Sequence, residues 1–159
     1  MIRLFVMDVD GTMTDGAIYL DGSVGEFKRF DVRDGLGISR LISSGVKTAI
    51  ISGRDSPATD RRARELGIGL VLQGVKDKLV ELKKMARDMS LDPEEVGYIG
   101  DDVNDCPCII WAGRGFAPSD AVPEARKAAD IVTSAAGGYG AVREAVEHIL
   151  HINGSKRTR

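Results

Sequence analysis

The strongest constraint on how this chain folds is a regular alternation of two kinds of segment. Short apolar runs rich in β-branched residues are followed by longer runs in which apolar residues recur at helical spacing. This alternation predicts an α/β fold with a doubly wound, mostly parallel sheet, and such sheets bind ligands beyond the carboxyl ends of their strands. The predicted strands are 3–7, 46–51, 68–72, 96–99, 115–117 and 131–132, and the predicted helices are 34–44, 57–66, 77–89, 103–111, 123–129 and 139–150.

One unit interrupts the alternation directly after the first strand. Residues 17–20 and 26–30 flank the turn sequence Asp21-Gly22-Ser23 and are typical of a β-hairpin. A lone two-stranded ribbon is marginal in water and exposes unpaired edges, so we expect it to pair with hairpins of other subunits. We therefore predict a single domain over residues 1–152 without a cap domain, a hairpin over residues 17–30 for oligomerisation, and a flexible basic tail over residues 153–159.

Composition excludes several classes of partner. The 159 residues carry a net charge of -2, which argues against binding to nucleic acid. No apolar run approaches the roughly 18 residues of a membrane span, and Asp8 comes too early for a secretory signal. Cys106 and Cys108 are too close together for an ordinary structural zinc pair, and we expect both to be reduced. These features predict a cytoplasmic protein with no membrane partner.

Two aspartates, Asp8 and Asp10, end the first predicted strand and are followed at once by Gly11. Side chains two residues apart share one face of a strand, so both carboxylates are expected at one edge of the sheet. Carboxylates held close together resist joint ionisation, which suits one as a nucleophile and the other as a proton carrier. The simpler alternative is a strand that ends in an ordinary Asp-Gly turn.

Polar residues also follow other predicted strands, at the same sheet edge. Ser52 offers a hydroxyl group and Gly53 a backbone N–H near a helix N-terminus, which suits an anion, although a turn with a serine N-cap explains them equally well. Lys78 opens the helix after strand 68–72 and offers a positive charge to a phosphate, although read alone it is better explained as a surface lysine.

Three aspartates, Asp101, Asp102 and Asp105, follow the strand 96–99. They could cap a helix, but beside Asp8 they would repel one another strongly without a cation. Ligation by a few carboxylate oxygens, with water and phosphate completing the shell, is typical of Mg²⁺. The sequence therefore predicts a magnesium site that includes Asp8 and Asp101.

These residues together indicate phosphoryl transfer through a covalent intermediate. Asp8 is expected to attack phosphorus and form an aspartyl phosphate, while Mg²⁺ bridges Asp8, Asp101 and a phosphate oxygen. Asp10 is expected to protonate the leaving alkoxide and then to take a proton from the attacking water. Ser52 and Lys78 are expected to stabilise the phosphoryl oxygens.

The chain resembles the haloacid dehalogenase (HAD) superfamily of phosphohydrolases. Its four motifs are found in order as Asp8-Val-Asp10-Gly-Thr, Ser52, Lys78 and Gly100-Asp101-Asp102. The resemblance implies a HAD-type fold, with Asp8 as the nucleophile and Asp10 as the acid/base. It also implies that Asp8, the backbone carbonyl of Asp10, and Asp101 hold magnesium.

A narrower resemblance covers nearly the whole chain. The runs 14–16, 25–26, 30–38, 52–54, 73–74 and 137–144 are similar to the capless branch that acts on sugar-acid phosphates, notably 3-deoxy-D-manno-octulosonate (KDO) 8-phosphate phosphatases. It implies an enzyme of lipopolysaccharide biosynthesis and a homotetramer built on a β-barrel of hairpins, in which each partner completes its neighbour's active site. The positions it places at the substrate are Asp10, Asp31, Val32, Arg33, Asp34, Gly35, Gly53, Arg54, Arg62 and Lys78.

Three alternatives remain open. Phosphatases of sialate-type 9-phosphates are close relatives, but they carry an acidic residue where this chain has Arg54. A phosphoacceptor receiver domain is also doubly wound, but its middle strand ends in the phosphorylated aspartate, and here that strand ends in Ser52. A non-catalytic module of the same fold is disfavoured by the intact set of four motifs. The arginines themselves are ambiguous: Arg33, Arg54 and Arg62 suit a carboxylate, while Arg61, Arg62 and Arg64 also fit a solvated helix face.

Overall fold

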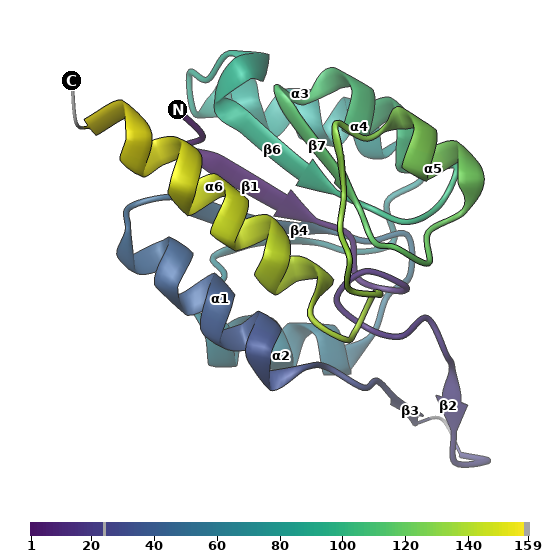
Figure 1. Cartoon of the computed structure of the whole chain (residues 1–159). Helices are drawn as coiled ribbons and strands as arrows, with labels where there is room; N and C mark the ends of the chain where they lie inside the picture. The colour runs from purple at the N-terminus through teal and green to yellow at the C-terminus, as the bar shows by residue number, and fades with distance from the viewer. Residues whose placement is uncertain (24, 158–159) are drawn as a thin grey trace.

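The computed structural model describes residues 1–23 and 25–157 and has a six-stranded parallel sheet at its centre (Figure 1). The strand order is β5-β4-β1-β6-β7-β8, so the chain adds strands first on one side of β1 and then on the other. The strands are β1 (Leu4–Met7), β4 (Lys47–Ile51), β5 (Leu70–Leu72), β6 (Val96–Ile99), β7 (Arg114–Ala117) and β8 (Ile131–Val132). This confirms the predicted doubly wound α/β sheet.

Helices cover both faces of the sheet (Figure 1). One face packs against α1 (Val32–Ser43), α2 (Pro57–Leu66) and α6 (Ala141–Arg157). The other packs against α3 (Lys78–Asp88), α4 (Cys106–Trp111) and α5 (Pro123–Ala128), and a short 3-10 helix, η1 (Pro93–Glu95), precedes β6. No described segment forms a cap domain.

The central strand β1 shows why the sequences of the strands are continuous apolar runs. Phe5 and Met7 of β1 point into the core beneath α1 and α6, whereas Leu4 and Val6 point into the core beneath α3 and α4. All four side chains are fully buried. Successive side chains of a strand point to opposite faces, so a strand covered on both sides must be apolar throughout.

Helix boundaries follow local capping chemistry. Asp31 begins α1, because its carboxylate accepts a hydrogen bond from the backbone N–H of Arg33, so this helix starts two residues before the predicted 34–44. Gly67 ends α2 in the left-handed conformation, as predicted from its position after Leu66. The predicted helix 103–111 is too long. It starts only at Cys106, because the preceding residues form the loop that carries Asp101.

The hairpin after β1 is shorter than predicted. It consists of β2 (Tyr19–Leu20) and β3 (Glu26–Phe27), and an isolated bridge between Thr14 and Phe30 closes its base. It extends away from the sheet (Figure 1) and leaves Leu20 72% and Phe27 60% exposed. Large apolar side chains that are exposed close together mark a candidate contact surface.

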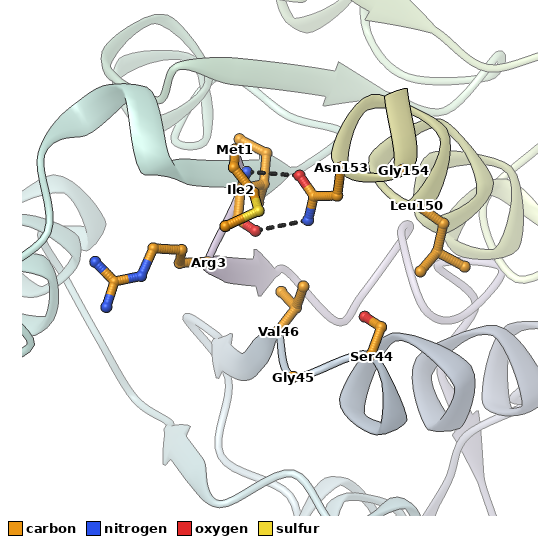
Figure 2. A pocket seen from close by; sticks show the side chains of 9 residues that line it. All are labelled: Met1, Ile2, Arg3, Ser44, Gly45, Val46, Leu150, Asn153 and Gly154. Carbon is orange, nitrogen blue, oxygen red and sulfur yellow. Dashed lines mark hydrogen bonds between the residues drawn. The ribbon is translucent and has the colours of Figure 1, made fainter. Parts of the chain in front are cut away.

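The amino ends of the strands lie at one edge of the sheet, and the hairpin follows the carboxyl end of β1 at the other edge. At the amino edge, the Asn153 side chain of α6 pairs with the backbone of Ile2, accepting from the N–H at 2.9 Å and donating to the carbonyl at 2.8 Å (Figure 2). This clamp explains why the last helix continues beyond the predicted Leu150, to Arg157, through much of the segment predicted as a tail. In the described part of the chain, no helix is both long and apolar enough to cross a membrane.

Candidate active site

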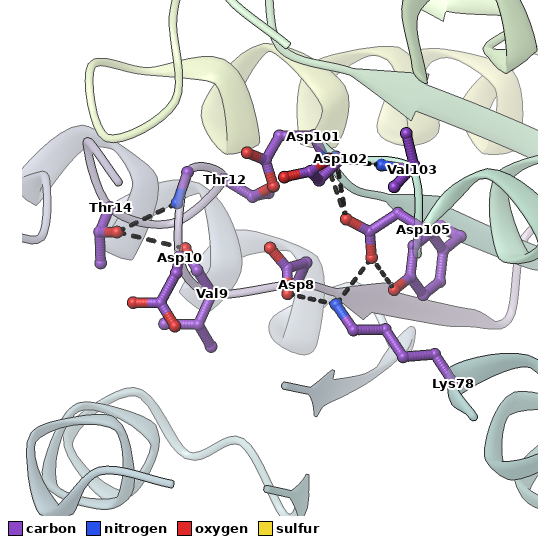
Figure 3. Close-up of polar contacts among 12 residues, drawn as sticks. Asp8, Val9, Asp10, Thr12, Thr14, Lys78, Asp101, Asp102, Val103 and Asp105 are labelled. Atoms are coloured by element: carbon purple, nitrogen blue, oxygen red, sulfur yellow. Dashed lines mark hydrogen bonds and ion pairs between the residues drawn. The ribbon is translucent and has the colours of Figure 1, made fainter. Parts of the chain in front are cut away.

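Asp8 and Asp10 leave β1 at the carboxyl edge of the sheet, between its neighbours β4 and β6. The backbone turns sharply here, because the Val9 carbonyl accepts hydrogen bonds from the N–H groups of Thr12 and Thr14. The Thr14 hydroxyl also accepts from the N–H of Gly11 at 3.3 Å (Figure 3). The turn is therefore fixed by its own sequence, and it presents both carboxylates beyond the strand end.

Lys78, the first residue of α3, reaches Asp8 from the other side. Its Nζ lies 2.6 Å from Oδ1 of Asp8 and 2.8 Å from Oδ1 of Asp105 (Figure 3). Only 4% of Lys78 is exposed, so the reading of Lys78 as a surface lysine is wrong. Burial lowers the pKa of Lys78, but the two carboxylates outweigh burial and raise this pKa overall, so the ammonium stays charged.

Asp105 organises this end of the site. Its Oδ1 accepts hydrogen bonds from Lys78 and from the Tyr98 hydroxyl, and its Oδ2 accepts from the backbone N–H groups of Asp101 and Asp102. It is fully buried. With four donors on its two oxygens, Asp105 fixes the loop after β6 rather than offering a free oxygen to a ligand.

Asp101 faces Asp8 across the strand ends, and the turn at Gly11 makes room for it. Gly11 has φ +91°, and a Cβ atom at this position would lie 2.0 Å from Oδ2 of Asp101. Only glycine satisfies both the positive φ and the close approach. The Thr12 hydroxyl also donates to Oδ1 of Asp101, at 3.4 Å. Gly11 therefore has a steric role, because it leaves room for the Asp101 carboxylate.

The charges of this cluster fit a divalent cation. One carboxylate oxygen each from Asp8, Asp101 and Asp105 can be chosen within 4.8 Å of one another, and Lys78 forms ion pairs with two of them, Asp8 and Asp105. Burial raises the pKa of Asp8 well above its usual range, and Asp105 raises it further, while Lys78 opposes both effects. Burial also raises the pKa of Asp101 to about 6. Ionised carboxylates are thus short of positive charge, and Asp8 and Asp101 retain oxygens that a hard cation such as Mg²⁺ could use.

These groups line a cavity of about 170 Å³ at the carboxyl edge of the sheet. Ser52 is buried at the end of β4, directly before the lining residue Gly53. Sites for small organic ligands are usually about 300–1,000 Å³, so this cavity suits a phosphoryl group better than a whole sugar phosphate. The residues that line it are Asp8, Asp10, Gly53, Arg54, Lys78, Asp101, Asp102 and Asn104.

Two hairpin residues that the sequence did not assign to the site, Lys28 and Glu26, connect Asp10 to Arg54. The ammonium of Lys28 forms an ion pair with Oδ1 of Asp10 and lies 2.8 Å from Oε1 of Glu26. Glu26 in turn accepts a 2.6 Å hydrogen bond from Arg54. The sequence indicates only that Glu26 and Lys28, two residues apart in the predicted strand 26–30, share a face opposite Phe27, and not which residue they contact.

The segment 31–35 and Arg62 do not line this cavity within the chain. Arg33 forms an ion pair with Asp31 and donates to the Tyr139 carbonyl, while Arg62 lies against α1 and donates to the Asp31 carbonyl. Asp34 accepts a hydrogen bond from the backbone N–H of Arg143 in the first turn of α6, so it joins two helices. Val32 is 82% exposed. Contact between these residues and a substrate bound at Asp8 would need an arrangement other than the one that the single chain shows.

The sequence of this chain is similar to those of known phosphohydrolases. Residues 70–145 match the sequence profile of haloacid dehalogenase-like hydrolases. The 3-deoxy-D-manno-octulosonate 8-phosphate phosphatase KdsC of Yersinia pestis is 45% identical over 149 residues, which cover 94% of this chain and 80% of the relative. KdsC of Escherichia coli K12 is 40% identical over 153 residues, covering 96% of this chain and 81% of the relative.

Solved structures agree with the sequence relatives. The Moraxella catarrhalis 3-deoxy-D-manno-octulosonate 8-phosphate phosphatase, in complex with magnesium, phosphate and KDO, superposes with a TM-score of 0.92 at 43% identity, covering 94% of this chain and 86% of that one. The cobalt-bound Haemophilus influenzae enzyme gives a TM-score of 0.92 at 39% identity, covering 96% and 90%. This chain therefore belongs to the haloacid dehalogenase-like hydrolases, in the family of the 3-deoxy-D-manno-octulosonate 8-phosphate phosphatases.

Proposed function

We propose that this protein is a magnesium-dependent phosphatase that converts 3-deoxy-D-manno-octulosonate 8-phosphate to 3-deoxy-D-manno-octulosonate and phosphate. The observation that carries the proposal is the buried Asp8 carboxylate, held by Lys78 and faced by Asp101 and Asp10, in a family whose members hydrolyse this phosphate. A place in lipopolysaccharide biosynthesis follows from the resemblance and is part of the proposal. Residues 1–152 serve as one catalytic domain.

Asp8 is the nucleophile. Its carboxylate oxygen forms a bond to phosphorus while the bond between phosphorus and the sugar oxygen breaks, which gives an aspartyl phosphate and splits a difficult hydrolysis into two easier steps. Lys78 holds one oxygen of Asp8, which fixes the direction of the other. Mg²⁺, when bound by Asp8, Asp101 and the Asp10 backbone carbonyl, supplies positive charge that offsets the repulsion between the carboxylates and the phosphate.

Asp10 transfers the protons. It gives a proton to the departing sugar oxygen and then removes one from the water that cleaves the aspartyl phosphate. Its side chain lines the same cavity as Asp8, which suits contact with both the leaving oxygen and the water. Lys78, the Ser52 hydroxyl and the Gly53 N–H stabilise the negative phosphoryl oxygens.

Arg54 binds the acidic end of the sugar. It lies at the mouth of the cavity with about half of its side chain exposed, and its guanidinium fork suits a carboxylate. The rival substrates are the sialate-type 9-phosphates, for which the acidic residue at this position is typical. The arginine favours the octulosonate phosphate.

Assembly into a homotetramer would complete the site. The cavity holds a phosphoryl group but is small for an eight-carbon sugar acid, and the hairpin exposes Leu20 and Phe27. Pairing of hairpins from several chains would bury these side chains and bring residues of one chain over the cavity of another. Asp31, Val32, Arg33, Asp34, Gly35 and Arg62 would then serve the substrate across subunits rather than within one chain.

Phosphate release from a panel of sugar-acid phosphates, with and without Mg²⁺, tests this function. We expect octulosonate 8-phosphate to be hydrolysed fastest, and EDTA to abolish turnover. Asp8→Asn should remove nearly all activity and keep the fold, because it barely changes side-chain volume. Retained turnover in Asp8→Asn, or indifference to EDTA, would contradict the mechanism. A preference for sialate-type 9-phosphates would contradict the substrate.

A further inference from the structure

The hairpin places two charged residues against the active site of its own chain. Glu26 and Lys28 lie on one face of the second hairpin strand and its extension, with Phe27 on the other face. The base of the hairpin is anchored beside them, because the Arg29 guanidinium donates to the Gly138 carbonyl and lies 4.1 Å from the centre of the Tyr139 ring. This anchoring fixes where the Lys28 side chain can reach.

The Lys28 side chain is enclosed although it belongs to a projecting hairpin. Only 2% of it is exposed, and its ammonium contacts the carboxylates of Asp10 and Glu26. Holding a long lysine side chain in one rotamer costs conformational entropy, and burying its charge costs solvation. A surface ion pair serving only to hold the hairpin would not require this burial.

The ion pairs continue to the substrate arginine. Glu26 accepts from Arg54 through Oε2 at 2.6 Å and faces Lys28 through Oε1 at 2.8 Å. Asp10, Lys28, Glu26 and Arg54 therefore form one line of alternating charge that joins two residues lining the cavity, Asp10 and Arg54. One end of this line is the proton carrier, and the other is the arginine assigned to the sugar acid.

We propose that Lys28 is a positioning residue that holds the Asp10 carboxyl in the orientation needed for proton transfer, and that Glu26 ties this ion pair to Arg54. The inference rests on the proposed function, since it needs Asp10 to serve as the acid. It gives the hairpin a catalytic role within its own chain, separate from any role in assembly.

The step that depends on Lys28 is the first one. As Asp8 bonds to phosphorus, the bond from phosphorus to the sugar oxygen breaks and its electron pair goes to that oxygen, which takes the proton from Asp10. Lys28 contacts Oδ1 of Asp10, which leaves Oδ2 free to carry the proton for the sugar oxygen. An aryl phosphate that releases 4-nitrophenolate needs no such proton, because its leaving group is stable as an anion.

The experiment compares kcat/KM on octulosonate 8-phosphate and on 4-nitrophenyl phosphate, since kcat/KM reports only the steps up to release of the leaving group. Lys28→Met should lower kcat/KM on the sugar phosphate by about 10- to 100-fold and have a much smaller effect on the aryl phosphate. Lys28→Arg, which keeps the charge, should recover part of the loss. Lys83→Met removes an exposed lysine of α3 and should change neither value.

A double variant separates positioning from folding. If Lys28 acts through Asp10, adding Lys28→Met to Asp10→Asn should cost nothing further, whereas independent effects would multiply. Melting temperature and light scattering are measured for each variant, and Lys28→Gln is tested alongside in case Lys28→Met folds poorly. Equal losses on both substrates, or multiplying effects in the double variant, would overturn the inference. A wild-type enzyme inactive on all sugar-acid phosphates would overturn the proposed function first, and this inference with it.

Discussion

The ammonium of Lys78 lies 2.6 Å from Oδ1 of Asp8, and both groups are buried at the carboxyl edge of the sheet. The same ammonium forms an ion pair with Oδ1 of Asp105 at 2.8 Å. One lysine thus compensates two carboxylates, with Asp101 close by and a share of the negative charge left over. From this imbalance we predict that the free energy of unfolding depends on bound cations.

Removing Lys78 should be costly for the fold as well as for the chemistry. Lys78→Met fills a similar volume but leaves Asp8 and Asp105 without their cation, and breaking a buried ion pair in this way typically costs about 3–5 kcal/mol. We expect a loss of unfolding free energy of this order without metal, measured by urea denaturation at pH 7. Lys83→Met on the exposed face of the same helix should cost less than about 0.5 kcal/mol. Equal stability of the two variants would show that the ion pair contributes nothing to the free energy of unfolding.

Mg²⁺ should stabilise the folded protein through Asp8 and Asp101. A ligand that binds only the native state at 100 times its dissociation constant adds about 2.7 kcal/mol. We expect the melting temperature to rise with Mg²⁺ concentration in the wild type and to stay nearly constant in Asp101→Asn. Asp88→Asn, which changes an exposed carboxylate at the end of α3, is the matched control and should respond like the wild type. A full Mg²⁺ response in Asp101→Asn would place the ion elsewhere.

The sequence predicts the centre of the site better than its surroundings. Asp8, Lys78 and Asp101 follow strands of one parallel sheet, and the carboxyl ends of such strands converge by geometry alone. Lys28 could not be predicted to reach Asp10, since its position depends on how the hairpin folds back and on the anchoring of Arg29 at the loop before α6. Local pattern carries no information about such a long-range contact.

The predicted lengths of α4 and α6 are wrong because tertiary contacts override the local sequence signals. The loop after β6 delays α4 to Cys106 because Asp105 draws the backbone N–H groups of Asp101 and Asp102 toward itself. Helix α6 continues past Gly154, a residue that disfavours helix, and the pairing of Asn153 with Ile2 holds this part of the helix against the first strand. Neither contact is visible in residue periodicity.

Asp34 should make stability fall as pH rises from about 4 to about 6. Burial raises its pKa from 3.8 to about 6 in the folded state, so the folded protein binds a proton that the unfolded chain has released. Its stabilising contribution is therefore present below about pH 4 and is lost as pH rises through about 6, which amounts to about 3 kcal/mol for a shift of this size. Asp34→Asn keeps an acceptor for the Arg143 N–H and removes the charge.

Urea denaturation of Asp34→Asn and the wild type from pH 4 to pH 8 measures this effect. We expect the variant to become more stable relative to the wild type as pH increases, with most of the change complete by about pH 7. Asp88→Asn, at an exposed site, should run parallel to the wild type. A constant difference between Asp34→Asn and the wild type across the range would contradict the assignment.

Assembly should depend on the apolar hairpin. Leu20 and Phe27 are 72% and 60% exposed in the single chain, and an aspartate at either position would put a charge into the interface proposed between hairpins. We expect Leu20→Asp to convert a tetramer into smaller species in light scattering coupled to gel filtration, with a loss of activity on the sugar phosphate. Val80→Asp, at an exposed apolar residue of α3, should remain tetrameric. A wild-type protein that is a fully active monomer would exclude both the barrel and the shared site.

Arg54 should decide which sugar acid is used. Arg54→Ala removes the guanidinium that pairs with Glu26 in the free chain and is assigned to the substrate carboxylate in the complex. If that contact is desolvated by the bound sugar, its loss should cost about 2–4 kcal/mol in kcat/KM on octulosonate 8-phosphate. A phosphate monoester without a carboxylate should be affected far less, because it makes no contact for the variant to lose.

The control for Arg54 is an arginine on the neighbouring helix. Arg61 of α2 is largely exposed and pairs only loosely with Glu65 at 3.6 Å, so Arg61→Ala should leave kcat/KM unchanged on both substrates. Arg54→Glu introduces the acidic side chain expected in the sialate-type enzymes. It should shift the preference toward 9-phosphates, because the glutamate repels the octulosonate carboxylate that Arg54 is assigned to bind. Equal losses in Arg54→Ala on the phosphate with a carboxylate and on the phosphate without one would instead assign this arginine to the phosphoryl group. The choice between sugar acids would then depend on residues that a second chain brings to the cavity.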